Sequence, residues 1–302
     1  MRRLLPLALL PALVLAGCSG TAGSPAASSS ASDGRVSVVA STDVWGDVVK
    51  QVGGSDVAVT SIIDDPTQDP HEYQATTRDQ LAVSRAGLVV VNGGGYDDFL
   101  SQLLKNAPGS TKTLNAVDAS GLDTEPADGE FNEHVWYDLP AVSKVAAAVS
   151  AELSRIDPSG AATFESNLQT FQGRLKDLEA TAADIRRTAE GKGVAITEPV
   201  PLYMTEALGL VNKTPEAFSE AVEEGDDVAP AVLKEELDLL REQQVAVLAY
   251  NEQTSDSTTE QVLAAAKRAG VPVVGVRETL PSGKDYLAWM QDDLQQFRSA
   301  VA

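Results

Sequence analysis

The stretch SGAATFESNLQTFQGRLKDLEATAADIRRTAE, residues 159–190, decides the fold of this chain. Its apolar residues recur at alternating spacings of four and three, which places them along one face of a helix. Asp157-Pro158 precedes the stretch and Gly191-Lys192-Gly193 follows it, and both are typical helix boundaries. At 1.5 Å per residue such a helix is about 45 Å long, longer than a small domain is wide. We therefore predict a linking helix at residues 158–191 between two lobes, with a coiled-coil partner helix as the alternative. The apolar residues are Phe164, Leu168, Phe171, Leu175, Leu178, Ala182 and Ile185.

Short apolar runs lie on both sides of this helix, and helical patterns lie between them. Because the runs are continuous rather than alternating, they predict strands that are buried on both faces of a parallel sheet. The alternation of strands and helices indicates an α/β fold with two lobes, at residues 35–157 and 192–302, each a mostly parallel sheet flanked by helices. The predicted strands are Val36–Ala40, Val57–Ile63, Leu88–Val91, Val194–Thr197, Val245–Tyr250 and Val271–Val276. The predicted helices include Val44–Val52, Thr76–Ala86, Pro140–Ile156, Pro230–Gln243 and Ser257–Ala269.

The first residues indicate where the protein is found. A positively charged start precedes the apolar run Leu4–Ala16, which is shorter than the roughly 20 residues that a membrane-spanning helix needs. We therefore predict a signal peptide at residues 1–17. It ends in Leu15-Ala16-Gly17-Cys18, which resembles the lipobox of bacterial lipoproteins, where a lipidated cysteine becomes the first mature residue.

Cys18 is the only cysteine, so the sequence predicts no disulfide. Residues 18–34, rich in Ser, Ala and Gly, are predicted to be a flexible tether. The expected location is the outer face of the bacterial cell membrane, with the exported chain anchored through lipid on Cys18.

The composition narrows the choice of partner. The formal charge of −21 argues against a nucleic-acid ligand, because phosphate binding needs a basic surface. An acidic protein raises the local concentration of cations, which is consistent with a cation ligand. A solvated acidic exterior is equally expected of any secreted protein, so the charge alone does not decide the ligand.

The chain has only two histidines, and both fall in predicted loops next to ordered elements. His71 follows the predicted strand that ends at Ile63, and His134 precedes the predicted helix that begins at Pro140. In the second lobe, Glu198 and Glu278 are each the first acidic residue after a predicted strand. Ligands of open α/β sheets bind beyond the carboxyl ends of strands, and two imidazoles with two carboxylates suit a divalent first-row metal. These four residues predict a metal site in the cleft between the lobes.

Several motifs carry a family resemblance from about Val36 to the end of the chain. The chain resembles the zinc- and manganese-type solute-binding lipoproteins of ABC transporters, whose two lobes are joined by one long rigid helix. The motifs are Asp69-Pro70-His71-Glu72-Tyr73, Asn92-Gly93-Gly94-Gly95-Tyr96-Asp97, Glu133-His134-Val135-Trp136-Tyr137-Asp138, the linking helix, and Tyr250-Asn251-Glu252-Gln253.

The resemblance implies a function and a ligand set. It implies a monomer that is not an enzyme, which captures a divalent metal ion outside the cell and passes it to an ABC permease in the membrane. The implied ligands are His71, His134, Glu198 and Glu278. Trp136, Tyr137 and Asn251 are expected to pack around these ligands or bond to them.

The resemblance leaves the metal open between zinc and manganese, with a slight preference for zinc. The third ligand is His in typical zinc members and Glu in typical manganese members, and the fourth is normally Asp rather than Glu278. The segment Asp118–Glu133 also lacks the histidines that zinc members often carry there. Oxygen ligands favour manganese, whereas intrinsic affinity favours zinc at most sites.

Two other functions compete with metal capture. One is a metal-dependent hydrolase with Glu72 or Glu206 as general base, but the sequence contains no His-Glu-x-x-His motif. The other is a surface adhesin or structural lipoprotein in which the metal is incidental.

Overall fold

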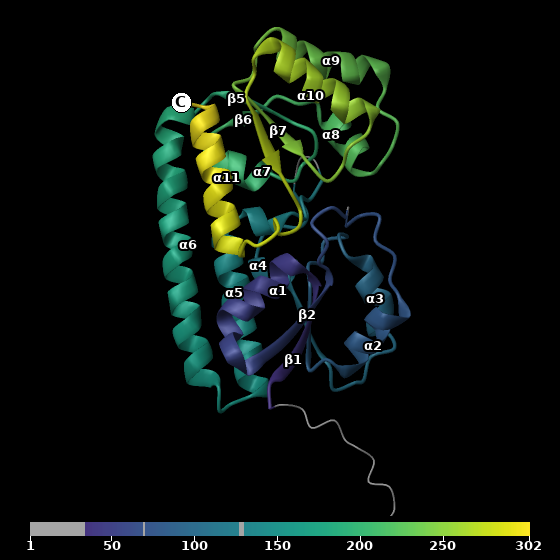
Figure 1. The fold of residues 1–302 in the computed structure, drawn as a ribbon, viewed down its shortest axis with the longest axis vertical. Coiled ribbons are helices and arrows are strands. Elements are labelled where there is room, and N and C mark those ends of the chain that lie inside the picture. Colours follow the sequence, from purple (N-terminus) through teal and green to yellow (C-terminus); the bar gives the residue numbers. More distant parts are fainter. Residues whose placement is uncertain (1–33, 69, 127–129) are drawn as a thin grey trace, which may run out of the picture. The chain divides into compact units, whose positions relative to one another are not determined.

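The computed structural model describes residues 34–68, 70–126 and 130–302. The predicted signal peptide, most of the predicted tether and the predicted lipidation site Cys18 lie outside the described residues. Arg35–Ala302 form one compact unit that contains two four-stranded sheets (Figure 1). Among the described residues, no helix is both long enough and apolar enough to cross a membrane.

The first sheet is parallel throughout and has the strand order β2-β1-β3-β4. Successive residues of its central strands face opposite sides: Val38 and Ala40 join one hydrophobic cluster, and Val39 joins another. Both faces are therefore covered, as the continuous apolar runs predict. The strands are β1 (Val36–Thr42), β2 (Val57–Ile63), β3 (Leu88–Val91) and β4 (Lys112–Asn115). The surrounding helices are α1 (Asp43–Gly53), η1 (Gly54–Asp56), α2 (Thr77–Arg85), α3 (Asp98–Leu104), α4 (Ala116–Ser120), η2 (Val135–Tyr137) and α5 (Leu139–Ile156).

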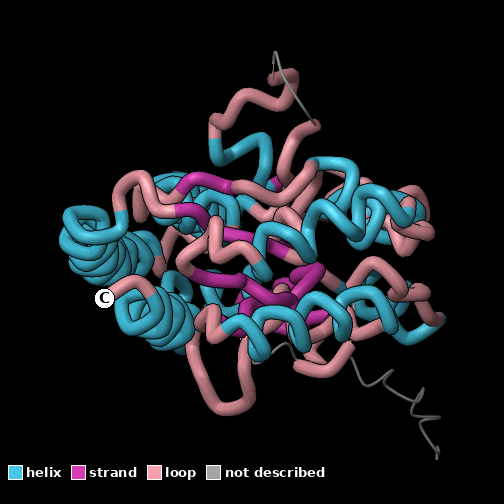
Figure 2. The backbone as a smooth tube through the Cα atoms, turned by 90° about the horizontal axis from the view of Figure 1, so that it is seen from above, coloured by secondary structure: helices cyan, strands magenta, loops and turns pink. Residues whose placement is uncertain are grey.

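The second sheet repeats this arrangement with the order β6-β5-β7-β8, again all parallel. Ile196 and Ala249 pack on the side of the main cluster, whereas Ala195 and Leu248 pack on the opposite side. Figure 2 shows strands in the interior with helices around them. The strands are β5 (Gly193–Ile196), β6 (Val211–Asn212), β7 (Val247–Asn251) and β8 (Val273–Val276). The helices are α7 (Leu202–Ala207), α8 (Glu216–Glu223), α9 (Pro230–Arg241), α10 (Ser257–Ala269) and α11 (Tyr286–Ala300).

The predicted linking helix is confirmed as α6 (Ala161–Ala189). All seven residues of its apolar stripe are buried. The helix packs against α1 and α5 beside the first sheet and against α7 and α11 beside the second (Figure 1). One hydrophobic cluster therefore continues from the first lobe into the second along α6.

Two strands were not predicted. β4 and β6 each form one edge of a sheet, and most of their residues are exposed or half-buried. Because they are covered on few sides, they need no continuous apolar run, whereas β2 and β8 at the opposite edges have such runs and were predicted.

Candidate metal centre

His134 lies between α4 and η2 with its ring completely buried. Its Nδ1 is 2.7 Å from Asn132 Oδ1, and its main-chain N–H donates to the same oxygen. An acceptor at this distance fixes the Nδ1–H tautomer and leaves Nε2 to face the site. The rings of Tyr96 and Trp136 pack edge-on against the imidazole, with centroids 5.8 and 5.1 Å away. The imidazole is therefore held in one orientation.

The motif Asn92-Gly93-Gly94-Gly95-Tyr96-Asp97 supports the His134 loop. The Asn92 side chain donates to the main-chain oxygen of Glu133, and the Asp97 carboxylate accepts from the N–H groups of Asn92 and Gly93. Gly93 has φ +82°, and a Cβ there would lie 2.3 Å from the Asn115 side chain, so the turn requires glycine. The motif thus connects the end of β3 to the residue that precedes His134.

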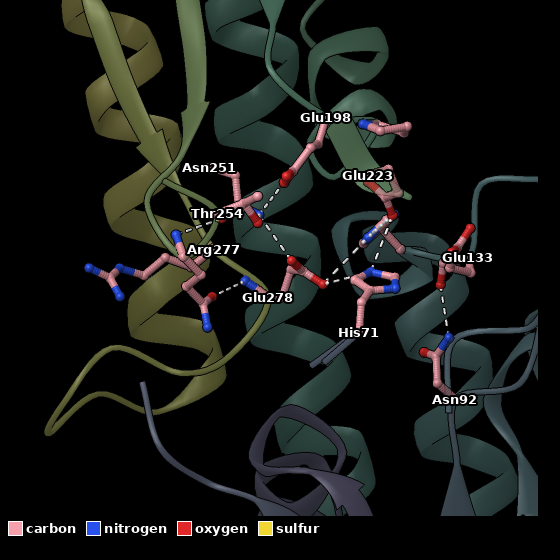
Figure 3. Close-up of polar contacts among 12 residues, drawn as sticks. His71, Asn92, Glu133, Glu198, Glu223, Asn251, Thr254, Arg277 and Glu278 are labelled. Carbon is pink, nitrogen blue, oxygen red and sulfur yellow. Dashed lines mark hydrogen bonds and ion pairs between the residues drawn. The ribbon is translucent and has the colours of Figure 1, made fainter. Parts of the chain in front are cut away.

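His71 reaches the same place from the loop after β2. Its side chain is 26% exposed, and its ring centroid is 6.2 Å from that of His134. The Nε2 atom lies 3.3 Å from Glu223 Oε1 and 3.4 Å from Glu278 Oε2. The two histidines therefore lie side by side. Figure 3 shows Glu223 and Glu278 of the second lobe approaching His71.

Glu278 follows β8 and is almost completely buried. Its main-chain N–H donates to Gln253 Oε1 at 2.6 Å, and its side-chain Oε1 accepts from Asn251 Nδ2 at 2.9 Å. With Oε1 occupied, Oε2 faces the histidines, 3.4 Å from His71 Nε2 and 3.7 Å from His134 Nε2.

Glu198 follows β5 and is buried, but its side chain is engaged elsewhere. Its Oε2 accepts a short hydrogen bond from Asn251 Nδ2, the same nitrogen that bonds to Glu278. Asn251 ends β7, which lies between β5 and β8, so its amide reaches the carboxylates that follow both neighbouring strands. Glu198 Oε1 has no hydrogen-bond partner among the residues that the structure describes.

A residue that sequence reasoning did not single out, Glu223, lies against both histidines. It is the last residue of α8, its side chain is 8% exposed, and its Oε1 is 3.3 Å from His71 Nε2 and 3.2 Å from His134 Nε2. The structure thus brings together His71, His134 and Glu278 as predicted, and it places Glu223 where Glu198 was expected. No sequence signal marks Glu223, because it is one of 44 acidic residues and follows no strand.

The aromatic residues beside His134 have separate roles. Trp136 packs on the imidazole, as described above. The Tyr137 hydroxyl donates to the main-chain oxygen of Arg277 at 3.0 Å and lies 3.3 Å from Asp293. Tyr137 therefore contacts the main chain of Arg277, the residue that precedes Glu278.

The electrostatics of the site favour protonated histidines when no ion is bound. Burial alone would lower the pKa of His71, but the nearby carboxylates of Glu223 and Glu278 outweigh burial and raise it to about 12. Burial also opposes protonation of His134, and the same carboxylates raise its pKa to about 10.

The three carboxyl groups divide into two kinds. Burial raises the pKa of each, but the two imidazolium groups outweigh burial at Glu278 and Glu223 and lower their pKa values below the usual range. Glu198 has no such partner, so burial and the charges of Glu278 and Glu223 raise its pKa to about 8. Without metal, the centre therefore holds two positive rings, two carboxylates and one neutral carboxyl group at neutral pH.

These groups suit a divalent cation. His71, His134 and Glu278 offer ligand atoms that all lie within 4.8 Å of one another. His134 Nε2, Glu278 Oε2 and both oxygens of Glu223 are buried and make no aligned hydrogen bond among the described residues, although Nε2 lies at ion-pair distance from Glu223 Oε1 and Glu278 Oε2. Buried polar atoms whose hydrogen-bonding capacity is incompletely satisfied are costly, so their convergence indicates a ligand that satisfies them. One divalent ion can replace the two imidazole protons without changing the net charge of the centre.

Comparisons with known proteins identify the family of the chain. Residues 38–300 match the family described as ZnuA, zinc-uptake complex component A, periplasmic. The manganese-binding lipoprotein MntA of Halalkalibacterium halodurans is 31% identical over 205 residues, which cover 66% of this chain and 65% of that protein, just under two thirds.

Two further matches cover most of the chain. The manganese ABC transporter substrate-binding lipoprotein scaA of Streptococcus gordonii is 26% identical over an alignment 318 residues long, which covers 99% of this chain and 98% of that protein. The fold is similar to that of the periplasmic zinc-binding protein TroA from Treponema pallidum, with a TM-score of 0.76 and 20% identity over 89% of this chain and all of that one. The linking helix, the paired parallel sheets and the match over residues 38–300 show that this chain belongs to the family of zinc-uptake complex component A, the substrate-binding proteins of metal ABC transporters.

Proposed function

We propose that this chain captures a divalent transition metal ion outside the cell and delivers it to an ABC permease in the membrane. In this proposal the protein acts as a monomer, is not an enzyme, and is anchored to the outer face of the membrane by lipid on Cys18. The observation that supports it best is the convergence of two buried or half-buried imidazoles and two carboxylates from different lobes. MntA and scaA are both named as lipoproteins, which supports the anchor, and scaA is named for an ABC transporter, which supports the permease.

We propose His71, His134 and Glu278 as three of the metal ligands. The fourth position has two candidates. The family resemblance implies Glu198, whereas the geometry favours Glu223, because its Oε1 lies within 3.3 Å of the Nε2 atoms of both histidines. Glu198 is instead bonded to Asn251 and is expected to keep its proton at neutral pH.

The proposed ion is zinc or manganese. Two nitrogen and two oxygen ligands suit either ion, and divalent zinc exceeds manganese in affinity at most sites of this kind. The relatives divide in the same way, since MntA and scaA are named for manganese and TroA for zinc. Elemental analysis of protein purified without added metal, followed by competition between the two ions, would distinguish them.

The ligand proposal is tested by calorimetry on His71→Ala and His134→Ala. Each replacement should weaken binding by orders of magnitude and leave the circular dichroism spectrum unchanged. Glu206→Gln is the control, because Glu206 is exposed and is not among the described residues whose ligand atoms converge at the metal centre. Unchanged affinity in either histidine variant would refute the site.

Two further measurements address the competing functions. A metal-dependent hydrolase would cleave ester or peptide substrates when loaded, and Glu206→Gln or Glu72→Gln would abolish that activity. An adhesin with an incidental metal would leave metal uptake normal in a deletion strain. Loss of uptake that is restored by the wild-type gene, but not by the His134→Ala gene, is the result expected for capture and delivery.

A further inference from the structure

A second group of metal-capable residues overlaps the first. His71, Glu133 and Glu223 offer ligand atoms within 4.8 Å of one another. We call His71, Glu133 and Glu223 the outer group, and we call His134 and Glu278, which belong only to the first group, the inner residues. His71 and Glu223 also approach the inner residues, whereas Glu133 belongs to this outer group alone.

The outer group borders a cavity and the inner residues do not. A cavity of about 1110 Å³ is lined by His71, Glu133 and Glu223, but His134 and Glu278 are absent from its lining. His134 and Glu278 are also almost completely buried, whereas the His71 side chain is 26% exposed. An ion that enters through this cavity therefore meets the outer group first.

The charge around the cavity favours a cation. Among the described residues that line it, none is Lys or Arg, and several carry carboxylates. Clustered negative charge at a cavity raises the local concentration of cations and the rate at which they arrive. The additional acidic residues are Glu125, Glu130, Glu216, Glu220, Glu224 and Asp226.

Glu223 belongs to the outer group and also approaches the inner residue His134, so its carboxylate gives the best support for a bound ion. Its side chain is 92% buried and lines the cavity. Its Oε1 lies at ion-pair distance from both histidines, and neither oxygen makes an aligned hydrogen bond among the described residues. One carboxylate can contact an ion in both positions, because Oε1 is 3.2 Å from His134 Nε2 while the residue also faces Glu133 in the outer group. Such a bridging ligand allows an ion to move inward without becoming fully hydrated again.

We propose that His71, Glu133 and Glu223 form an outer entry site that binds a divalent cation from solvent before the ion passes to His134 and Glu278. This proposal rests on the proposed function, because it supplies the route into that metal centre. With one nitrogen, two carboxylates and water in the remaining positions, the outer site should bind more weakly and discriminate less between metals than the inner one.

The equilibrium test removes the inner site and keeps the outer one. The double variant His134→Ala/Glu278→Gln is titrated with Mn²⁺ alone and followed by electron paramagnetic resonance. It should bind one Mn²⁺ at least 100-fold more weakly than the wild type. Adding Glu133→Gln should weaken this residual binding at least 10-fold more, and adding Glu130→Gln, which removes the same charge from the same cavity, should change it less than 2-fold.

Each result has a distinct meaning. Wild-type affinity in the double variant would refute the inner site and hence the proposed function. No residual binding in a folded double variant, or equal effects of Glu133→Gln and Glu130→Gln, would refute the outer site alone.

A kinetic test uses the intact centre and does not depend on folding of the double variant. In stopped-flow measurements with Mn²⁺, Glu133→Gln should slow association and dissociation by a similar factor of at least 5, because an entry site lies on the path in both directions. The dissociation constant should change less than either rate constant. Association as fast as in Glu130→Gln would overturn the proposal.

Discussion

Gln253 Nε2 donates a hydrogen bond to the main-chain oxygen of Gln68 at 2.7 Å, which joins β7's end to the loop that carries His71. The same side chain accepts from the N–H groups of Glu278 and Thr279 through Oε1. One amide therefore connects the loop of the proposed ligand His71 in the first lobe with the loop of the proposed ligand Glu278 in the second. Arg277 reinforces the connection, because its Nη1 donates to the main-chain oxygen of Pro66 at 2.9 Å.

Replacing Gln253 should weaken metal binding through the two loops that its side chain supports. Gln253→Met keeps the length of the side chain and removes all its hydrogen bonds, so both ligand loops lose a support. Supports of this kind are typically worth about 10- to 100-fold in metal affinity. Calorimetry with Zn²⁺ and Mn²⁺ should show a loss in this range, with Gln261→Met on the exposed face of α10 as the control. An affinity equal to that of the control would show that the contact is incidental.

The two candidates for the fourth ligand can be compared directly. Glu223→Gln should reduce metal affinity more than Glu198→Gln does, because Glu223 Oε1 is within 3.3 Å of both Nε2 atoms and Glu198 is bonded to Asn251. Both variants remove one carboxyl group and preserve shape, so each is the control for the other. The reverse order of affinities would mean that Glu198 replaces Glu223 when metal is bound.

Proton release provides an independent count of the ligands. Because the pKa values of His71 and His134 are raised to about 12 and about 10, both rings carry a proton that must leave before the ring can bind metal. Binding at pH 7 should therefore release about two protons per ion, and the apparent affinity should rise about 100-fold per pH unit near neutral pH.

Calorimetry in buffers of different ionisation enthalpy measures this number. If Glu198 also became a ligand, its proton would be released as well and the count would approach three, because its pKa is raised to about 8. Release of less than one proton would contradict ligation by the two histidines.

Much of the fold could be predicted because its signals are local. The stripe from Phe164 to Ile185 is a repeated spacing within one helix, and the buried strands are continuous apolar runs. The edge strands β4 and β6 were missed because exposed strands lack such runs. Their pairing depends on neighbours that are distant in sequence, such as β3 for β4.

The site was predictable where it depends on the two histidines and on strand ends. Glu198 and Glu278 follow β5 and β8, and this topology does bring them near each other, with Asn251 between them. Glu223 comes from the end of α8, and its approach to His134 depends on how that helix is oriented against the second sheet. No periodicity or spacing in the sequence encodes that orientation.

The metal-free protein should be most stable in mildly acidic solution and should lose stability as the pH rises from 6 to 9. Raised pKa values at His71 and His134 stabilise the folded state fully below the usual histidine value of 6.5, and this contribution declines as the pH rises toward 10 to 12. Glu198, with a pKa raised from 4.5 to about 8, loses its contribution over the interval between those values. Glu223 and Glu278, with lowered pKa values, act in the opposite direction and lose theirs as the pH falls below 4.5.

Bound metal should reverse the trend above pH 6, because the ion replaces the imidazole protons and binds more tightly as they become easier to remove. The melting temperature, measured by differential scanning fluorimetry with chelator and with excess Zn²⁺, should therefore differ more at pH 8.5 than at pH 6. His134→Ala removes one of the two titrating rings, so its metal-free melting temperature should depend less on pH. A metal-free protein whose melting temperature rises between pH 6 and 9 would show that the rings are neutral in the absence of metal.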